Sequence, residues 1–141
     1  MKVTILGTNG FLSQAIAVYC KMYPLNMYGL DEPKGHTYDS FHRVNLMTEE
    51  LNYDNLVESD IIVYAIGAGI QSNLKEGNDL IYNLNVTCPV KICNALKTAG
   101  YKGCFITFGS VFEMGATKEE RFFTETDVLT STCPAPNDYT V

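Results

Sequence analysis

Short apolar runs of strand length alternate with segments of helical periodicity along this chain, and this alternation restricts the possible folds most. Strands are expected at residues 2–7, 25–31, 41–46, 60–67 and 103–110. Helices are expected at residues 10–22, after Thr48, and at residues 77–98, where Gly100 ends the helix. The rest of the chain is expected to form loops. Strands that alternate with helices form parallel sheets. The sequence therefore predicts an α/β fold with right-handed crossovers.

Composition and charge narrow the class of protein. The 141 residues suffice for one domain, and 46% hydrophobic with 18% charged residues is ordinary for a globular protein. A formal net charge of −6 argues against a nucleic-acid partner. The N-terminus does not resemble a signal peptide and no apolar stretch has the length of a membrane span, so we expect a cytoplasmic protein without a membrane partner. The five cysteines lack CxxC spacing and are expected to be buried, reduced thiols without a metal.

The residues between the first strand and the first helix have the composition of a phosphate-binding turn. Gly7 permits a tight turn, and Gly10 lets the backbone come close to a pyrophosphate. Asn9 lies in the same turn, and the N–H groups of Phe11 and Leu12 at the helix start would face the phosphates. The sequence therefore predicts a dinucleotide-binding turn.

An acid at the end of the second strand strengthens this prediction. Asp31 follows the glycine turn by about twenty residues, where a carboxylate can accept both ribose hydroxyls of adenosine. The same carboxylate would repel a 2′-phosphate, so NAD is favoured over NADP, and Lys34 is the one nearby cation that weakens this preference. The alternative is that the glycines only turn the chain and Asp31 is a solvated loop acid.

The segment GTNGFLS, residues 7–13, resembles the GxxGxxG fingerprint of the short-chain dehydrogenase/reductase family, whose extended branch acts on sugar nucleotides. Ser13 stands at the third glycine and is small enough for close packing of helix on strand. The resemblance covers essentially the whole chain. It implies one NAD(P)-binding domain over residues 1–141, with a Rossmann-like doubly wound parallel sheet of five strands in the order 3-2-1-4-5.

Further cofactor-binding residues follow from the resemblance. Asn45 and Leu46 stand where the family usually places an Asp and an aliphatic residue against the adenine. Three small or aliphatic residues look like the end of the family's fourth strand, which lies along the cofactor: Ala65, Ile66 and Gly67.

Asn85 resembles the asparagine of the family's NVxGT segment, which short-chain dehydrogenases use in a proton relay. Pro89 has no N–H to donate to the Asn85 carbonyl four residues earlier. The carbonyl could then hold a water in the active site, or Pro89 could bend the helix without a chemical role, and the sequence leaves both open.

The resemblance also identifies candidate catalytic residues. Ser110 matches the family's catalytic hydroxyl at the end of the fifth strand, and Tyr139 matches the tyrosine of YxxxK. A free phenol has a pKa of about 10, so it needs a nearby cation to act as a base near neutrality. The family's lysine would fall two positions beyond Val141. Glu113 is a second candidate, either as an acid that acts on a proton alpha to a keto group or as a solvated turn residue.

The resemblance implies the N-terminal part of an NAD-dependent epimerase, dehydratase or keto-reductase that acts on a nucleotide-linked sugar. We expect an incomplete chain that lacks the later helices, a further strand and the substrate-binding part. Such a chain should bind its cofactor weakly, lack turnover, and associate with itself through an uncovered sheet edge and face. A non-catalytic dinucleotide sensor and an inactive remnant of a truncated gene are the alternatives.

Overall fold

The computed structural model of the chain describes residues 1–35, 37–69, 76–109, 122 and 124–130. The strands are β1 (Val3–Leu6), β2 (Leu25–Gly29), β3 (Ser40–Arg43), β4 (Ile61–Tyr64) and β5 (Cys104–Ile106). They form a 5-stranded sheet in the order β3-β2-β1-β4-β5, and every neighbouring pair is parallel. The strands lie in the expected ranges, with β3 beginning one residue early, and the predicted order is confirmed.

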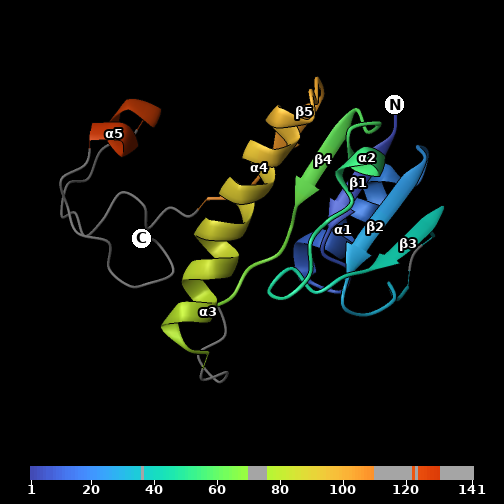
Figure 1. Cartoon of the computed structure of the whole chain (residues 1–141), viewed down its shortest axis with the longest axis horizontal. Helices are drawn as coiled ribbons and strands as arrows, with labels where there is room; N and C mark the ends of the chain where they lie inside the picture. The colour runs from blue at the N-terminus through green and yellow to red at the C-terminus, as the bar shows by residue number, and fades with distance from the viewer. Residues whose placement is uncertain (36, 70–75, 110–121, 123, 131–141) are drawn as a thin grey trace.

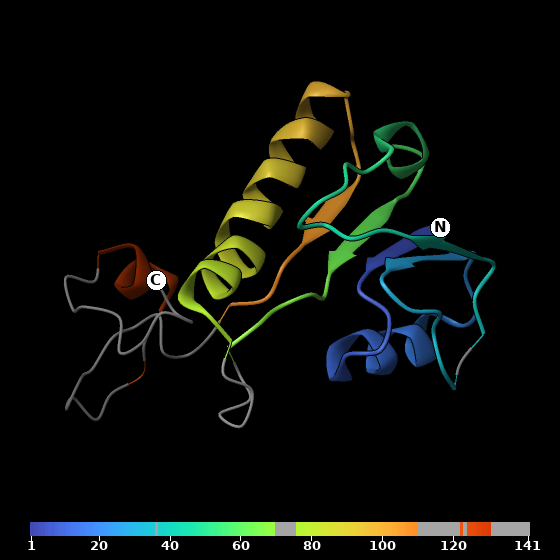
Figure 2. The same cartoon turned by 60° about the horizontal axis from the view of Figure 1, so that its bottom comes forward.

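The helices cover both faces of this sheet. They are α1 (Phe11–Cys20), α2 (Tyr53–Leu56), α3 (Asn78–Tyr82), the π-helix η1 (Asn83–Thr87), α4 (Cys88–Thr98) and α5 (Glu125–Thr130). α3, η1 and α4 follow one another without a break and form one long helical segment (Figure 1). Figure 2 shows this segment on one side of the sheet and α1 on the other. The fold is therefore the expected doubly wound, Rossmann-like α/β arrangement.

The core consists of two layers because successive strand residues point to opposite faces. On the α1 side, Val3 and Ile5 of β1 pack in a cluster with Ala17 of α1. On the other side, Leu6 packs in a cluster with Ile92 and Leu96 of α4. All residues of β1 are buried, as an apolar run covered on both faces requires.

The helix expected after Thr48 begins later than the sequence suggested. α2 starts at Tyr53, and the side chain of Asn52 caps it by accepting a hydrogen bond from the Asp54 amide at 3.0 Å. The Thr48 amide donates instead to the Asn45 carbonyl at 3.0 Å. The backbone amides of Thr48 and Glu49 are bound within this turn, to the Asn45 carbonyl. The helix therefore begins after the next residue that can cap it, Asn52.

The expectation of a plain loop after residue 110 is wrong where α5 stands. The Asp127 carboxylate accepts hydrogen bonds from the Thr124 amide at 2.7 Å and from the Thr124 hydroxyl at 2.9 Å. The Asp127 amide donates to the Thr124 carbonyl at 3.0 Å. A threonine followed three residues later by an acid is a capping signal that the sequence did contain.

The four cysteines that the structure describes are less buried than expected, and Cys133 lies outside the described residues. Cys20 and Cys88 are half-buried, whereas Cys93 and Cys104 are exposed. Cys93 lies on α4 away from the core, and Cys104 lies on the side of β5 opposite Phe105, which packs under α4. Within the described residues, none of the helices has both the length and the apolar character that crossing a bilayer requires.

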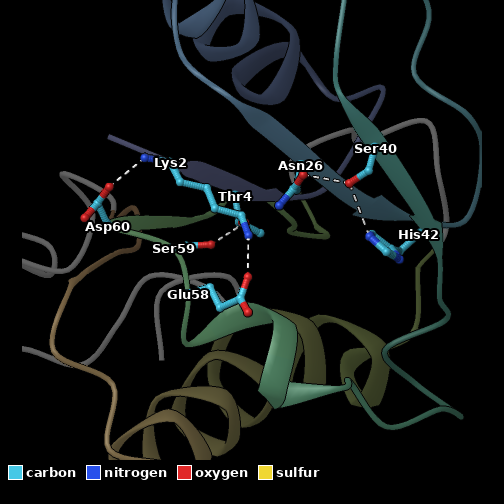
Figure 3. A network of polar contacts seen from close by, with 8 residues as sticks. All are labelled: Lys2, Thr4, Asn26, Ser40, His42, Glu58, Ser59 and Asp60. Carbon is cyan, nitrogen blue, oxygen red and sulfur yellow. Dashed lines mark hydrogen bonds and ion pairs between the residues drawn. The ribbon is translucent and has the colours of Figure 1, made fainter.

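Polar contacts tie β1 and β4 together at the end of the sheet where both strands begin (Figure 3). The Lys2 ammonium contacts the Glu58 carboxylate at 2.9 Å, and the Lys2 amide donates to Asp60 at 2.6 Å. The buried hydroxyls of Thr4 and Ser59 share a hydrogen bond of 2.7 Å. These contacts fix the starting ends of the strands, so the opposite, carboxyl ends are the place to look for a site.

Candidate functional site

The turn between β1 and α1 requires glycine at its first position. Gly7 has a φ of 116°, a left-handed conformation that side chains disfavour. A Cβ atom at Gly7 would lie 2.9 Å from the Ala65 carbonyl oxygen and 3.0 Å from the Ser13 hydroxyl. The Gly7 amide donates to the Tyr28 carbonyl at 2.7 Å. The chain itself therefore demands glycine here, as the sequence predicted.

Gly10 differs, because nothing within the described chain demands that it lack a side chain. Its backbone is extended, with a φ of −72°, and a Cβ atom would lie 3.5 Å from the Ser13 hydroxyl, an ordinary contact. Gly10 stands at the start of α1, which has no side-chain cap, and the next residues, Phe11 and Leu12, are exposed. An uncapped helix start with exposed residues fits an anion bound to backbone amides.

Ser13 confirms the close packing expected at the third position of the fingerprint. Its side chain is fully buried, and its hydroxyl donates to the Ala65 carbonyl at 3.4 Å. This contact joins α1 to the residue that follows β4. A serine therefore serves where the family has glycine, because its small side chain fits and finds a partner.

Asn9 holds the segment after β2 against the glycine turn. Its side-chain amide donates to the Glu32 carbonyl at 3.1 Å, and its side-chain oxygen accepts from the Lys34 amide at 3.0 Å. Asp31 is exposed and directly precedes this pinned segment. The structure thus places the acid at the carboxyl end of β2, beside the turn. The hydrogen bonds of Asn9 hold the backbone that follows Asp31.

The close approach of the turn to β2 has a second cause. A Cβ atom at Gly29, the last residue of β2, would lie 2.8 Å from the side chain of Thr8. Only glycine lets the turn and the end of β2 come this near. Sequence reasoning missed Gly29, because its need depends on a neighbour that folding brings there.

Asn45 and Leu46 follow β3 at the same edge of the sheet. The Asn45 side-chain oxygen accepts a hydrogen bond from the Met47 amide at 3.0 Å, which shapes a turn. Leu46 packs against the core cluster beneath α4, and the Cys88 thiol contacts its carbonyl at 3.8 Å. Asn45 and Leu46 are both half-buried.

The segment after β4 is held by contacts from both sides. The Ala65 amide donates to the Leu6 carbonyl at 2.8 Å, and Ile66 packs against the core. The Asn85 side chain accepts from the Ala68 amide at 2.9 Å and donates to the Ala68 carbonyl at 3.0 Å. Gly67 is exposed, and a Cβ atom there would lie 3.2 Å from the Asn85 side-chain oxygen.

Asn85 lies in η1, four residues before Pro89 in the first turn of α4. The helical segment changes to a π-register in the residues that precede Pro89. The side chain of Asn85 is occupied by the Ala68 peptide, so a proton-relay role at this position is left to its main-chain carbonyl. Sequence reasoning missed the carboxylate of Glu76, which accepts a hydrogen bond from the Gly69 amide.

The structure brings the cofactor candidates to one edge of the sheet. Gly7, Asp31, Asn45 and Ala65 each follow a different parallel strand, and the carboxyl ends of parallel strands form the usual ligand-binding edge of such folds. The candidate catalytic residues Ser110, Glu113 and Tyr139 lie outside the described residues.

Comparisons with known proteins agree with this geometry. Residues 3–141 match the model of the NAD-dependent epimerase/dehydratase family. A comparison with the curated proteins gives no match.

Solved structures of similar fold include UDP-N-acetylglucosamine 4-epimerase from Methanobrevibacter ruminantium M1, in complex with UDP-N-acetylmuramic acid. It is 14% identical with a TM-score of 0.75, over 99% of this chain and 46% of that chain. MoeE5, solved with UDP-glucose and NAD, is 15% identical with a TM-score of 0.74, over 99% of this chain and 44% of that one.

A GalE-like L-threonine dehydrogenase from Cupriavidus necator is 15% identical with a TM-score of 0.61, over 82% of this chain and 38% of that one. The chain thus spans about half the length, or less, of these three structures. At such identities the likeness shows the fold, and the match to the family model shows the family. The chain belongs to the NAD-dependent epimerase/dehydratase family.

Proposed function

We propose that this chain is the NAD-binding N-terminal part of an epimerase, dehydratase or keto-reductase that acts on a sugar carbon of a nucleotide-linked sugar. The observation that carries the proposal is the uncapped start of α1 beside Gly10, next to the exposed acid Asp31. Membership of the family and the nucleotide-sugar ligands of two similar structures support the substrate class.

The residues present fit a dinucleotide. The pyrophosphate would lie at the start of α1, where Phe11 and Leu12 carry amides that face outward from an end without a side-chain cap. Asp31 would accept the hydroxyls of the adenosine ribose, with Asn45 and Leu46 near the adenine. The stretch from Ala65 to Gly67 would lie along the nicotinamide half.

The Asp31 carboxylate makes NAD the preferred cofactor. A 2′-phosphate placed against this carboxylate would meet a like charge, whereas a free ribose hydroxyl can donate to it. Lys34 follows three residues later, but its amide is bound to Asn9, which fixes the backbone of that segment.

When bound, the nicotinamide ring accepts or donates a hydride at the sugar carbon. We assign the proton at the sugar oxygen to Tyr139, with Ser110 hydrogen-bonded to the same oxygen. Glu113 is the candidate acid for a proton alpha to a keto group, and the Asn85 carbonyl is the candidate for holding a relay water. Tyr139 would act as a base near neutrality only with a cation beside it that lowers the pKa of its phenol.

Calorimetric titration of NAD and NADP tests the cofactor assignment. The chain should bind NAD more tightly than NADP, and Asp31→Asn should weaken NAD binding by about 10- to 150-fold, because a hydrogen bond to a charged group contributes about 1.5–3 kcal/mol. The same variant should narrow the difference between NAD and NADP. Asp54→Asn, an exposed acid in the first turn of α2, is the control and should change neither affinity. Equal affinities of the unchanged chain for NAD and NADP would contradict the assignment.

A further inference from the structure

We propose that Tyr64 is a positioning residue, whose hydroxyl holds η1 in the register that presents Asn85 to the Ala68 peptide. Its effect on cofactor binding rests on the proposed function, because Ala68 follows the stretch assigned to the nicotinamide half. Three observations carry the proposal: a freed carbonyl in the helix, a buried donor that meets it, and the contacts that depend on the register.

The freed carbonyl belongs to Leu84. In an α-helix the Cys88 amide would donate to Leu84, four residues earlier. In η1 the Cys88 amide donates to Asn83 instead, five residues earlier. The Leu84 carbonyl therefore lacks its usual helical donor, and the Tyr64 hydroxyl donates to it at 2.6 Å.

Pro89 explains why the register changes at this point. It is buried in the first turn of α4 and has no N–H to offer the Asn85 carbonyl. The proline thus interrupts the α-helical pattern, and Tyr64 satisfies a carbonyl that the changed pattern leaves free. Each residue supports the same local structure from a different side.

Tyr64 is well suited to this role. It is the last residue of β4, is 2% exposed, and packs in the cluster that contains Ile92 and Leu96 of α4. Burial raises the pKa of Tyr64 well above its usual value, and the nearby Cys88 adds to the shift. The hydroxyl therefore keeps its proton and remains a donor.

The contacts that depend on the π-register of η1 are those made to Ala68 and Gly69, which follow β4. Asn85 makes two hydrogen bonds to the Ala68 peptide, and Glu76 binds the neighbouring Gly69 amide. Ile81 of α3 and Ile92 of α4 are both buried, so the two helices cannot rotate freely. If η1 returned to the α-helical pattern, its turn would hold one residue fewer. The helix before η1 would then be rotated by about 100° relative to the helix after it. Asn85 would then lose its geometry with Ala68.

Tyr64→Phe removes only the hydroxyl and tests the proposal. The dissociation constant for NAD should rise about three- to tenfold, the range expected for one hydrogen bond. In ¹⁵N-resolved spectra the Ala68 amide should shift and should exchange with solvent faster.

Tyr101→Phe is the matched control. The Tyr101 hydroxyl also donates to backbone carbonyls, of Cys104 at 3.0 Å and of Asp60 at 3.3 Å, but near the starting ends of β4 and β5. This variant should lose comparable stability while the NAD affinity and the Ala68 amide stay unchanged. A change that is the same in both variants, or an unaltered Ala68 amide in Tyr64→Phe, would overturn the proposal.

Pro89→Ala supplies a second route if Tyr64→Phe does not fold. It restores an N–H at position 89, which should favour the α-register, release Leu84 from Tyr64 and shift the Ala68 amide in the same way. An unshifted Ala68 amide in Pro89→Ala would then count against the proposal. If the unchanged chain binds no NAD, the proposed function fails, and the Ala68 amide still decides the role of Tyr64.

Discussion

The two glycines of the β1–α1 turn are glycines for different physical reasons. Gly7 has a positive φ and lies against the Ala65 carbonyl, so the folded chain requires it. Gly10 has an ordinary φ and room for a Cβ atom. No described residue requires glycine at this position, and we propose that the ligand of this turn does.

Gly7→Ala should lower the free energy of unfolding by about 1–3 kcal/mol, the usual cost of a residue held in a disfavoured backbone region. The short distance from the added Cβ to the Ala65 carbonyl acts in the same direction. Denaturant unfolding followed by circular dichroism measures the change. Gly10→Ala is the matched control and should stay within about 0.5 kcal/mol of the unchanged chain. Equal destabilisation by both variants would contradict the distinction.

At the scale of elements, periodicity and turn residues were enough to predict the strands, α1 and the long helix. Buried runs such as that of β4 have few alternative structures, and Gly100, with a φ of 79°, ends α4 as expected. The start of α2 was not predictable, because it depends on how the Asn45 carbonyl binds the Thr48 amide. The π-register of η1 was not predictable either, because it depends on Tyr64, which lies on β4, twenty residues before Leu84.

Among the described residues, β5 and the segment after it carry exposed apolar side chains. Ile106 is 37% exposed, Phe108 beyond the strand is 46% exposed, and Cys104 is exposed as well. In the part of the chain that the structure describes, β5 is also an edge strand. Unpaired strand edges with apolar neighbours tend to pair with other chains.

We therefore expect the 141-residue chain to associate with itself in a concentration-dependent way, as measured by light scattering. Ile106→Lys should shift the population toward monomer, because a charge on an edge strand opposes pairing. Val90→Lys is the control, since Val90 is an exposed apolar residue on α4, which covers the opposite side of the sheet from α1. A monodisperse monomer at all concentrations would show that the exposed apolar side chains of β5 do not drive association.

At the scale of the whole molecule, the candidate site is the edge where the parallel strands end. The sequence predicted its members after β1 and β2 because a glycine turn and an acid at this spacing have few other uses in such a fold. It could not predict that the Asn9 side chain would form hydrogen bonds with the backbone after Asp31, or that the Asn85 side chain would form hydrogen bonds with the Ala68 peptide. Those contacts join residues far apart in the chain, and only folding brings them together.

The central claim is that a dinucleotide binds with its pyrophosphate at the start of α1. Calorimetric titration of NAD into the unchanged chain and into Gly10→Ala tests it most directly. The added methyl should weaken NAD binding by about tenfold or more, because it would occupy the space assigned to the pyrophosphate. NAD affinity that is unaltered in Gly10→Ala would contradict this placement of the cofactor.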